Sequence, residues 1–319
     1  MAEGRARLDV SVVIAAYNVE GYIRRAVDSA LAQEGVAVEV IVVDDGSVDG
    51  TATAAEVPDE RVRVLRTPGN LGPSAARNLA IGQARAPWVA ILDGDDVLLP
   101  GRLSRLIELA TASGADIVVD NLEVRRESDG AAYPMYAAED FGASRVLGLR
   151  YFIERNSQFL GGKTMSLGYV KPLISRDFLS RNKLLYDPEL RIGEDFMLLA
   201  DALALGARCV TDLSAGYGYT VRAGSISHRM TGAEAQRIAA GDRRFEQRHD
   251  LDAPARRSLA RRTAGLRQAL AFSEFVEALQ QRRFWAAFLM VLRRPVLIWR
   301  LRWAIFGRLG GLFKERHYG

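Results

Sequence analysis

Apolar runs that alternate with stretches of helical periodicity are the feature that most constrains the fold of this 319-residue chain. The runs at 10–16, 38–43 and 88–93 are rich in Val, Ile, Leu and Ala, which is typical of strands buried on both faces of a parallel sheet. The pattern predicts strands at 10–16, 38–43, 61–66, 88–93 and 115–124, and helices at 20–33, 51–57, 75–84 and 102–113. This alternation, with its short connections, implies an α/β domain with a parallel sheet, helices on both faces and right-handed crossovers.

Polar residues gather where the first four predicted strands end. These clusters are Tyr17-Asn18, Asp44-Asp45, the turn around Asn70, and Asp93-Asp95-Asp96. One such cluster alone is more often a solvated loop or a helix cap, and we expect Asp49 and Ser74 to be N-caps. The carboxyl ends of parallel strands, however, share one edge of the sheet, where ligands bind in folds of this class. Four clusters at one edge therefore predict a binding site.

The way in which this site would hold phosphates can be narrowed from the motifs. A G-x-G-x-x-G turn does not follow the first strand, and the chain has no G-x-x-x-x-G-K-[ST] loop. Three carboxylates within residues 93–96 repel one another, and a hard divalent cation between them and a diphosphate would relieve that repulsion. Asp93 and Asp95 flank Gly94, so both can point at one ion. The sequence therefore predicts Mg²⁺ or Mn²⁺ as the cofactor, bound by Asp93 and Asp95.

The ordered set of motifs resembles the family-2 inverting glycosyltransferases of the GT-A fold, which use nucleotide-diphosphate sugars. The match covers about the first 230 residues and is most similar to bacterial exopolysaccharide glucosyltransferases of the succinoglycan type. Its motifs are the run ending in Tyr17-Asn18, Val-Asp-Asp-Gly-Ser at 43–47, Asn-Leu-Gly at 70–72 with Ala-Arg-Asn at 76–78, Asp93-Gly94-Asp95, and Glu194-Asp195. Ala15 stands where the family usually has Pro, which implies a slightly less rigid loop. The resemblance implies a GT-A α/β fold: a mainly parallel central sheet flanked by helices, with a helical C-terminal extension.

The resemblance also implies residue roles on the donor side. Ala16, Tyr17 and Glu20 would line the base and ribose of a UDP-sugar. Asp45 would accept from the uracil N3–H, and Arg77 would lie beside the base. Asp93 would bind ribose or metal-bound water, while Asp95 would ligate the metal directly. Arg77 has a simpler alternative, a surface arginine on an amphipathic helix, and UDP is favoured over other nucleotides only through the family loop.

The acidic pair Glu194-Asp195 opens an apolar helix about a hundred residues after the donor motifs. Acidic residues at a helix N-terminus are favourable in themselves, which accounts for much of Glu194. The resemblance makes Asp195 the general base, which takes the proton of the acceptor hydroxyl as that hydroxyl attacks C1 from the face opposite the nucleotide. The metal would carry the charge of the departing diphosphate. The acceptor expected from the resemblance is a lipid-linked oligosaccharide.

Four later residues have two readings each. Tyr217 and Tyr219 would stack on acceptor sugars and Arg222 would reach the diphosphate, or these three side chains would pack in the core. His228 would complete the metal shell or, as we favour, remain a solvated or structural histidine.

The charge is unevenly distributed along the chain. Residues 241–319 hold 17 Lys and Arg against 7 Asp and Glu, whereas residues 1–240 hold 26 against 32. The last forty residues place Trp285, Trp299 and Trp303 among leucines and arginines and are interrupted by Pro295. This composition is typical of helices at a membrane surface, and no run reaches the length of a membrane span. No aromatic-basic repeat indicates nucleic-acid binding. Packing on the catalytic domain or a dimer contact is the alternative.

These observations predict three regions: a nucleotide-sugar-binding half at 1–125, an acceptor-binding half with the base at 126–230, and a basic helical extension at 231–319. The single cysteine, Cys209, excludes an intramolecular disulfide. Because residues 1–16 have no clear cleavage site after a short apolar run, we expect a cytoplasmic enzyme, peripheral on the inner face of the cytoplasmic membrane. Two rivals are a haloacid-dehalogenase-like phosphatase, whose Asp-x-Asp-x-Val motif normally ends the first strand rather than the fourth, and a non-catalytic nucleotide-sugar-binding protein.

Overall fold

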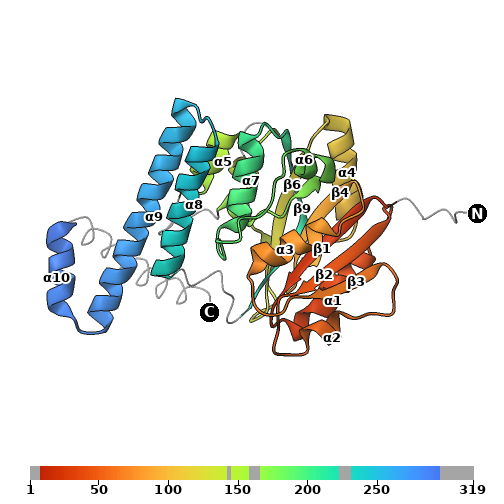
Figure 1. Cartoon of the computed structure of the whole chain (residues 1–319), viewed down its shortest axis with the longest axis horizontal. Coiled ribbons are helices and arrows are strands. Elements are labelled where there is room, and N and C mark those ends of the chain that lie inside the picture. Colours follow the sequence, from red (N-terminus) through yellow and green to blue (C-terminus); the bar gives the residue numbers. More distant parts are fainter. Residues whose placement is uncertain (1–7, 142–144, 158–165, 223–230, 295–319) are drawn as a thin grey trace, which may run out of the picture.

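The computed structural model describes residues 8–141, 145–157, 166–222 and 231–294. A curved central sheet lies between layers of helices, and three further helices extend from the side of the sheet that carries the second half of the chain (Figure 1). The fold is therefore the expected α/β arrangement with a helical C-terminal region.

The first part of the chain alternates strands and helices as predicted. Its elements are β1 (Val10–Ala16), α1 (Glu20–Leu31), β2 (Val38–Asp44), α2 (Thr51–Ala55), β3 (Val62–Arg66), α3 (Pro73–Gly82) and β4 (Trp88–Asp93). The four strands are parallel neighbours in the order β3-β2-β1-β4. Every residue of β2 is buried, and so is every residue of β1 except Ala15, because helices cover both faces. Parallel strands of this kind bring their carboxyl ends to one edge.

The remaining strands make the sheet mixed. The elements are β5 (Val97–Leu98), α4 (Arg102–Ser113), β6 (Ile117–Arg126), β7 (Ala132–Pro134), α5 (Leu149–Arg155), β8 (Leu173–Ser175), α6 (Arg176–Arg181), α7 (Glu194–Ala204) and β9 (Cys209–Val221), with short 3₁₀ helices at Ala138–Phe141 and Leu167–Tyr169. Strand β8 lies between β4 and β6 and runs antiparallel to both. Strand β9 then pairs parallel with β6, and β5 pairs with β9. The two predicted halves thus share one sheet, and the boundary at 125 stays a prediction.

Two helix caps differ from the sequence prediction. The N-cap of α2 is Gly50, although the carboxylate of Asp49 still accepts from the backbone N–H of Thr51 at 3.1 Å. The N-cap of α3 is Gly72 with Pro73 in the first turn, and the hydroxyl of Ser74 instead donates to the carbonyl of Leu190 at 2.7 Å. Ser74 lies two positions after the N-cap, inside the helix, where its hydroxyl is not placed to cap the first turn. The hydroxyl makes a tertiary hydrogen bond instead.

The C-terminal region is helical as far as it is described. Its elements are α8 (Gly232–Arg248), α9 (Ala253–Gln280) and α10 (Phe284–Arg293). Helix α8 begins with a capping box between Thr231 and Glu234. Helix α9 packs along α5 and α8, and α10 folds back on α9. None of the described helices combines the length and the apolar character that a membrane crossing requires. Trp299, Trp303 and His228 lie outside the described residues.

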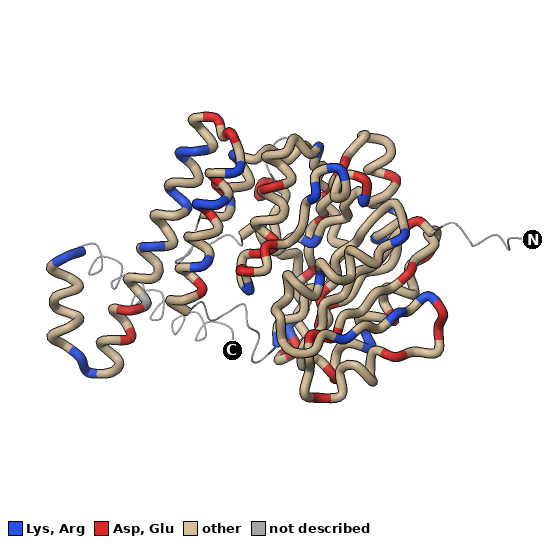
Figure 2. The backbone as a smooth tube through the Cα atoms, viewed as in Figure 1, with Lys and Arg blue, Asp and Glu red and all other residues tan. Residues whose placement is uncertain are grey.

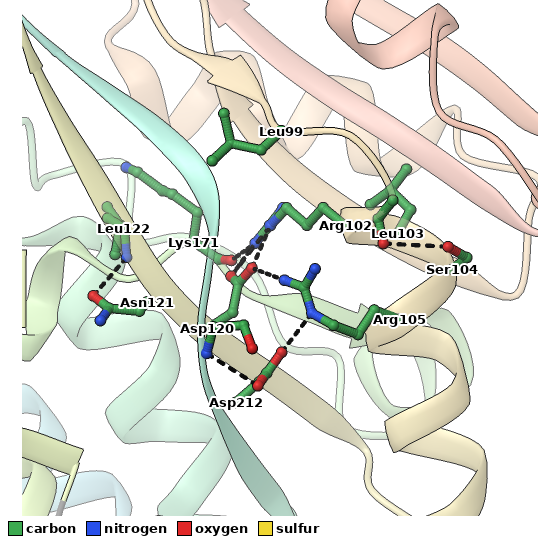
Figure 3. Close-up of polar contacts among 12 residues, drawn as sticks. Leu99, Arg102, Leu103, Ser104, Arg105, Asp120, Asn121, Leu122, Lys171 and Asp212 are labelled. Carbon is green, nitrogen blue, oxygen red and sulfur yellow. Dashed lines mark hydrogen bonds and ion pairs between the residues drawn. The ribbon is translucent and has the colours of Figure 1, made fainter. Parts of the chain in front are cut away.

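A buried ion pair joins α4 to the centre of the sheet (Figure 3). The guanidinium of Arg102 is bidentate to Asp120 on β6, with distances of 2.9 Å from Nε to Oδ2 and 2.8 Å from Nη2 to Oδ1. Neither side chain is exposed. Arg105 adds a second cation at 3.4 Å from Asp120 and binds Asp212 on β9 at 2.6 Å. Because the Arg102 guanidinium also donates to the carbonyl of Lys171 at 2.5 Å, this pair fixes the segment that leads into β8.

Breaking this pair should strongly destabilise the protein. We expect Arg102→Met to lower the free energy of unfolding by about 3–5 kcal/mol, because Asp120 would be left as a buried charge. Urea unfolding measures the effect. Arg24→Ala, which removes an exposed i,i+4 pair with Asp28, is the matched control and should cost less than about 1 kcal/mol. Equal losses in the two variants would contradict the structural role of the buried pair.

Candidate active site

The polar clusters that follow β1, β2 and β3 meet at the carboxyl edge of the sheet, as predicted. The backbone N–H of Asn18 donates to Ser47 Oγ at 2.9 Å, and Asn18 Oδ1 accepts from the N–H of Val48 at 3.0 Å. Glu20 accepts from the N–H of Gly50 at 3.0 Å. Ala16 is buried, whereas Tyr17 is 38% exposed. The loop after β1 is thus held against the loop after β2, and Tyr17 is left open to solvent beside them.

Asp45 connects the loops after β2 and β3. Its carboxylate accepts from the N–H groups of Leu71 and Gly72 at 2.9 and 2.7 Å and from the hydroxyl of Thr67 at 3.0 Å. The next residue, Gly46, has φ 70°, and a Cβ there would lie 2.6 Å from the backbone of Gly69. The loops can approach this closely only with glycine at position 46. Asp45 therefore has a clear structural task, and its contact with uracil stays a prediction.

The Asn70 turn and α3 anchor the segment that precedes Glu194 and Asp195. The side chain of Asn78 binds both the N–H and the carbonyl of Tyr186, at 2.9 and 2.8 Å. Arg191 donates to the side chain and the carbonyl of Asn70 at 2.9 and 3.1 Å. Together with the bond from Ser74 to Leu190, these contacts hold residues 186–191 against α3 and the turn that precedes it. The motif at 70–78 therefore places the distant acidic pair.

Two buried cations lie among the carboxylates at the end of β4 and the start of α7. Arg77 Nη2 is 2.6 Å from Asp93 Oδ1, and Arg77 Nη1 is 2.8 Å from Glu194 Oε1 and 3.4 Å from Asp195 Oδ1. Lys171 Nζ is 2.7 Å from Asp93 Oδ2 and 2.5 Å from Asp195 Oδ2. Arg77 is buried, so its alternative as a surface arginine is wrong; it binds acids rather than leaving its charge in water.

These contacts set the ionisation of the cluster. Burial would lower the pKa of Lys171 and of Arg77, but Asp195 and Asp93 raise the pKa of each well above its ordinary value. Burial would raise the pKa of Asp93, but Lys171 and Arg77 lower it well below its usual range. The pKa of Glu194 is raised, first by burial and then by Asp195. Asp93 is therefore a carboxylate held between two cations.

The other two acids of the β4 cluster are neutralised in different ways. Asp95 Oδ2 accepts from Arg222 Nε at 2.8 Å. Asp96 is buried and accepts from the hydroxyl of Tyr217 and the N–H of Thr220, both at 2.7 Å. Burial and the nearby Asp93 and Asp95 raise the pKa of Asp96 well above its ordinary value. Asp96 thus ties the site to β9 and does not cap α4, whose N-cap is Gly101.

Tyr217 lies in the core rather than on an acceptor surface. It is fully buried, and its hydroxyl also accepts from the N–H of Asp93 at 3.0 Å. Tyr219 is nearly buried and meets Tyr169 edge to face. Of the two readings of these tyrosines, core packing is the one that their positions match.

Comparison with known proteins places this site in a family. Residues 11–181 match the model described as glycosyl transferase family 2. Over 302 residues the chain is 45% identical to the succinoglycan biosynthesis protein ExoO of Rhizobium meliloti (strain 1021). This match covers 94% of this chain and 86% of ExoO. The chain belongs to glycosyl transferase family 2. The rival interpretation as a haloacid-dehalogenase-like phosphatase is thereby set aside.

Solved structures confirm the fold of this glycosyltransferase. S. aureus TarS, residues 1–349 in complex with UDP-GlcNAc, aligns with a TM-score of 0.61 at 20% identity over 83% of this chain and 71% of that chain. The mannosyltransferase PcManGT from Pyrobaculum calidifontis, in complex with GDP-Man and Mn²⁺, aligns with a TM-score of 0.59 at 18% identity over 93% and 84%. At these identities the likeness concerns the fold, and the predicted GT-A fold class is confirmed.

The contacts of the carboxylates indicate which of them could bind a divalent cation in this glycosyltransferase. Within the described ranges, no three His, Cys, Asp or Glu side chains are grouped so as to hold a metal ion. Both carboxylate oxygens of Asp93 contact cations, whereas Asp95 pairs with Arg222 through one oxygen and is partly exposed. Mg²⁺ in nucleotide enzymes is commonly held by one or two carboxylates plus substrate phosphates. The residues therefore fit a metal that Asp95 holds together with a bound diphosphate, while Asp93 is the less available ligand.

Lys171 is the site residue that sequence reasoning missed. It lies between Val170 and Pro172 in an apolar stretch, and a lone lysine in such a stretch is a sign of a buried, paired charge. Its two acidic partners are 78 and 24 residues away in the chain, so local pattern does not identify them.

Proposed function

We propose that this family-2 enzyme is an inverting, metal-dependent hexosyltransferase, moving a sugar, with glucose as the first candidate, from a UDP-sugar to a lipid-linked exopolysaccharide repeat unit. The likeness to ExoO supports the exopolysaccharide acceptor, and the complexes of TarS with UDP-GlcNAc and of PcManGT with GDP-Man and Mn²⁺ support a nucleotide-sugar donor and a metal. Residues 1–125, 126–230 and 231–319 are the proposed donor, acceptor and membrane-facing regions.

The observation that carries the proposal is the position of Asp195. This carboxylate comes from α7, about a hundred residues after Asp93, yet Lys171 contacts both at 2.7 Å or less. Asp195 Oδ1 is buried and has no hydrogen-bond partner among the described residues, so this carboxylate oxygen has a lone pair left to accept a proton. A base beside the donor motif is what a single in-line displacement at C1 requires.

The remaining roles are assigned to the chain's own groups. Tyr17, Ala16, Glu20 and Asp45 would bind the nucleoside at the edge formed by β1 and β2. Arg77 would keep Asp93 and Asp195 in place rather than bind the base directly. A divalent cation held by Asp95 would neutralise the charge that develops on the departing diphosphate. Arg222, which binds Asp95, would then be available to the same diphosphate.

The direct experiment is an assay of the purified protein against a panel of nucleotide sugars with Mg²⁺ or Mn²⁺ and a lipid-linked glycan acceptor. Transfer with inversion supports the proposal. Nucleotide-sugar binding without any turnover would instead indicate a non-catalytic binding protein.

Loss of the base should separate turnover from donor binding. We expect Asp195→Asn to lower kcat by about 10²–10⁴-fold, the usual contribution of a general base. Calorimetry should show UDP affinity close to that of the wild type, because the ion-pair partners of Asp195 are Arg77 and Lys171 rather than the residues proposed for the nucleoside. A variant that keeps transfer but loses UDP binding would contradict the assignment.

Loss of the metal site should affect both steps. We expect Asp95→Ala to abolish transfer and to weaken UDP-sugar binding, and EDTA to inactivate the wild type until Mg²⁺ or Mn²⁺ is restored. Asp177→Ala, at an exposed acid on α6, is the control and should behave as the wild type. Full activity of the wild type in EDTA would end the metal hypothesis.

The described part of the C-terminal extension supports attachment to a membrane surface. Helix α10 exposes Phe284, Trp285, Phe288 and Leu292, and Trp285 is 74% exposed. Arginines lie at both ends of α10 (Figure 2). Near an anionic leaflet each such charge contributes about 1 kcal/mol, screened by salt, and a tryptophan ring suits the headgroup layer. We therefore place the enzyme on the inner face of the cytoplasmic membrane, where a lipid-linked acceptor is presented.

Apolar residues of α10 should govern liposome binding. We expect the double variant Trp285→Ser/Phe288→Ser to lose most flotation with anionic liposomes at low salt, while the wild type floats and is partly released by high salt. Leu185→Ser is the control, because Leu185 is an exposed leucine outside α10, and this variant should float like the wild type. If the wild type stays soluble with anionic liposomes at low salt, the membrane proposal fails.

A further inference from the structure

We infer that Lys171 is a positioning residue for this reaction: its ammonium group fixes the carboxylate of Asp195 against the donor motif and determines which oxygen faces the acceptor. The inference rests on the proposed role of Asp195 as base. The known motifs of the chain include neither Lys171 nor the segment that carries it.

The contacts of Asp195 are asymmetric. Its Oδ2 receives a hydrogen bond from Lys171 Nζ at 2.5 Å. Its Oδ1 is buried, lies 3.4 Å from Arg77 Nη1 and has no hydrogen-bond partner among the described residues. A carboxylate oxygen that already accepts from an ammonium group is a poor proton acceptor, so the contact with Lys171 leaves Oδ1 as the oxygen that would take the proton of the acceptor hydroxyl.

Lys171 also connects the base to the donor side. Its Nζ is 2.7 Å from Asp93 Oδ2, and Arg77 binds the other oxygen of Asp93. The contacts thus form a closed ring of alternating charge. Its members are Asp93 on β4, Lys171 just before β8, Asp195 on α7 and Arg77 on α3. Within this ring the position of Asp195 depends on that of Asp93, which lies in the motif expected to meet the donor.

The main chain at Lys171 is firmly held, so its ammonium group has a fixed origin. Its carbonyl accepts from the Arg102 guanidinium, which Asp120 binds bidentately. The carbonyl of the following Pro172 accepts from the N–H of Ile91 on β4 at 3.3 Å. Figure 3 shows the Lys171 side chain pointing away from Arg102 and Asp120. The Arg102–Asp120 pair therefore anchors the main chain of Lys171, while the ammonium group of Lys171 contacts Asp93 and Asp195.

The primary test is kinetic. We expect Lys171→Met to lower kcat by at least about 100-fold, as for loss of a general base, with the KM for the UDP-sugar changed by less than about 5-fold because Arg77 still holds Asp93. Lys183→Met is the matched control, since Lys183 is exposed on the loop after α6, and it should keep wild-type kcat. A Lys171→Met enzyme with wild-type kcat overturns the inference.

A second variant pair distinguishes positioning from general structural support. If Lys171 acts through Asp195, adding Lys171→Met to Asp195→Asn should lower kcat by less than about 3-fold further, because groups that act as a unit are not additive. A full 100-fold further loss overturns the inference. In Lys171→Ala, millimolar ethylamine should restore part of kcat, whereas it should have no effect on Lys183→Ala. If there is no rescue and the losses in the double variant are additive, Lys171 has only a structural role and the inference is overturned.

A measurement without turnover separates this inference from the proposed function. Urea unfolding of Lys171→Met, Asp195→Asn and the double variant should give a double-variant midpoint shift clearly smaller than the sum of the single shifts. If the wild type transfers no sugar but this coupling is present, the proposed function fails and the positioning contact stands. If the shifts add fully, the contact is absent in solution and the inference fails whatever the activity.

Discussion

Charge compensation at the carboxyl edge of the sheet is the constraint on which the rest of the structure depends. Two like charges 4 Å apart repel by about 4 kcal/mol at an effective dielectric constant of 20, so uncompensated acids at residues 93–96 would disrupt the end of β4. Each acid is relieved differently: Asp93 by two buried cations, Asp95 by Arg222, and Asp96 by burial that favours its protonated form. The cations come from α3, from the residues just before β8 and from the residue after β9, so relief of the repulsion brings distant parts of the chain together.

This compensation changes how a metal enters the argument. The sequence suggested that a cation is needed to relieve the repulsion, but the described residues already supply three positive side chains for it. A divalent ion at Asp95, as we propose, would therefore compete with Arg222 for that carboxylate. Since the coordination of Mg²⁺ is usually completed by substrate phosphates, occupancy of the proposed site would depend on donor binding, and exchange of Arg222 from Asp95 to the diphosphate would keep the local charge balanced.

The parts of the fold that could be predicted are those encoded locally. Strands β1, β2 and β4 follow from continuous apolar runs between amphipathic helices, β3 follows from an alternating run, and the convergence of their polar ends follows from parallel pairing. The insertion of β8 between β4 and β6 could not be predicted, because three residues with no alternation carry no periodic signal. The same limit applies to the site: Asp93, Asp95 and Asp195 stand in recognisable motifs, whereas Lys171 has meaning only through partners that the fold brings to it. Tyr217 was ambiguous because an aromatic residue on a strand has the same pattern whether it packs inward or contacts a sugar.

The turn at 70–78 shows how the two predicted halves are joined in one sheet rather than in two independent units. The side chains of Asn70, Ser74 and Asn78 bind residues 186–191. These contacts fix the segment that leads into the helix beginning at Glu194. Strand β8 pairs with β4, and the Arg102–Asp120 pair fixes the chain just before β8. Asp195, whose helix is held through α3, and Lys171, whose main chain is held through α4 and β6, are therefore brought together beside Asp93. Because reactions at C1 are sensitive to errors of about 1 Å in geometry, such positioning would suit the single displacement that we propose.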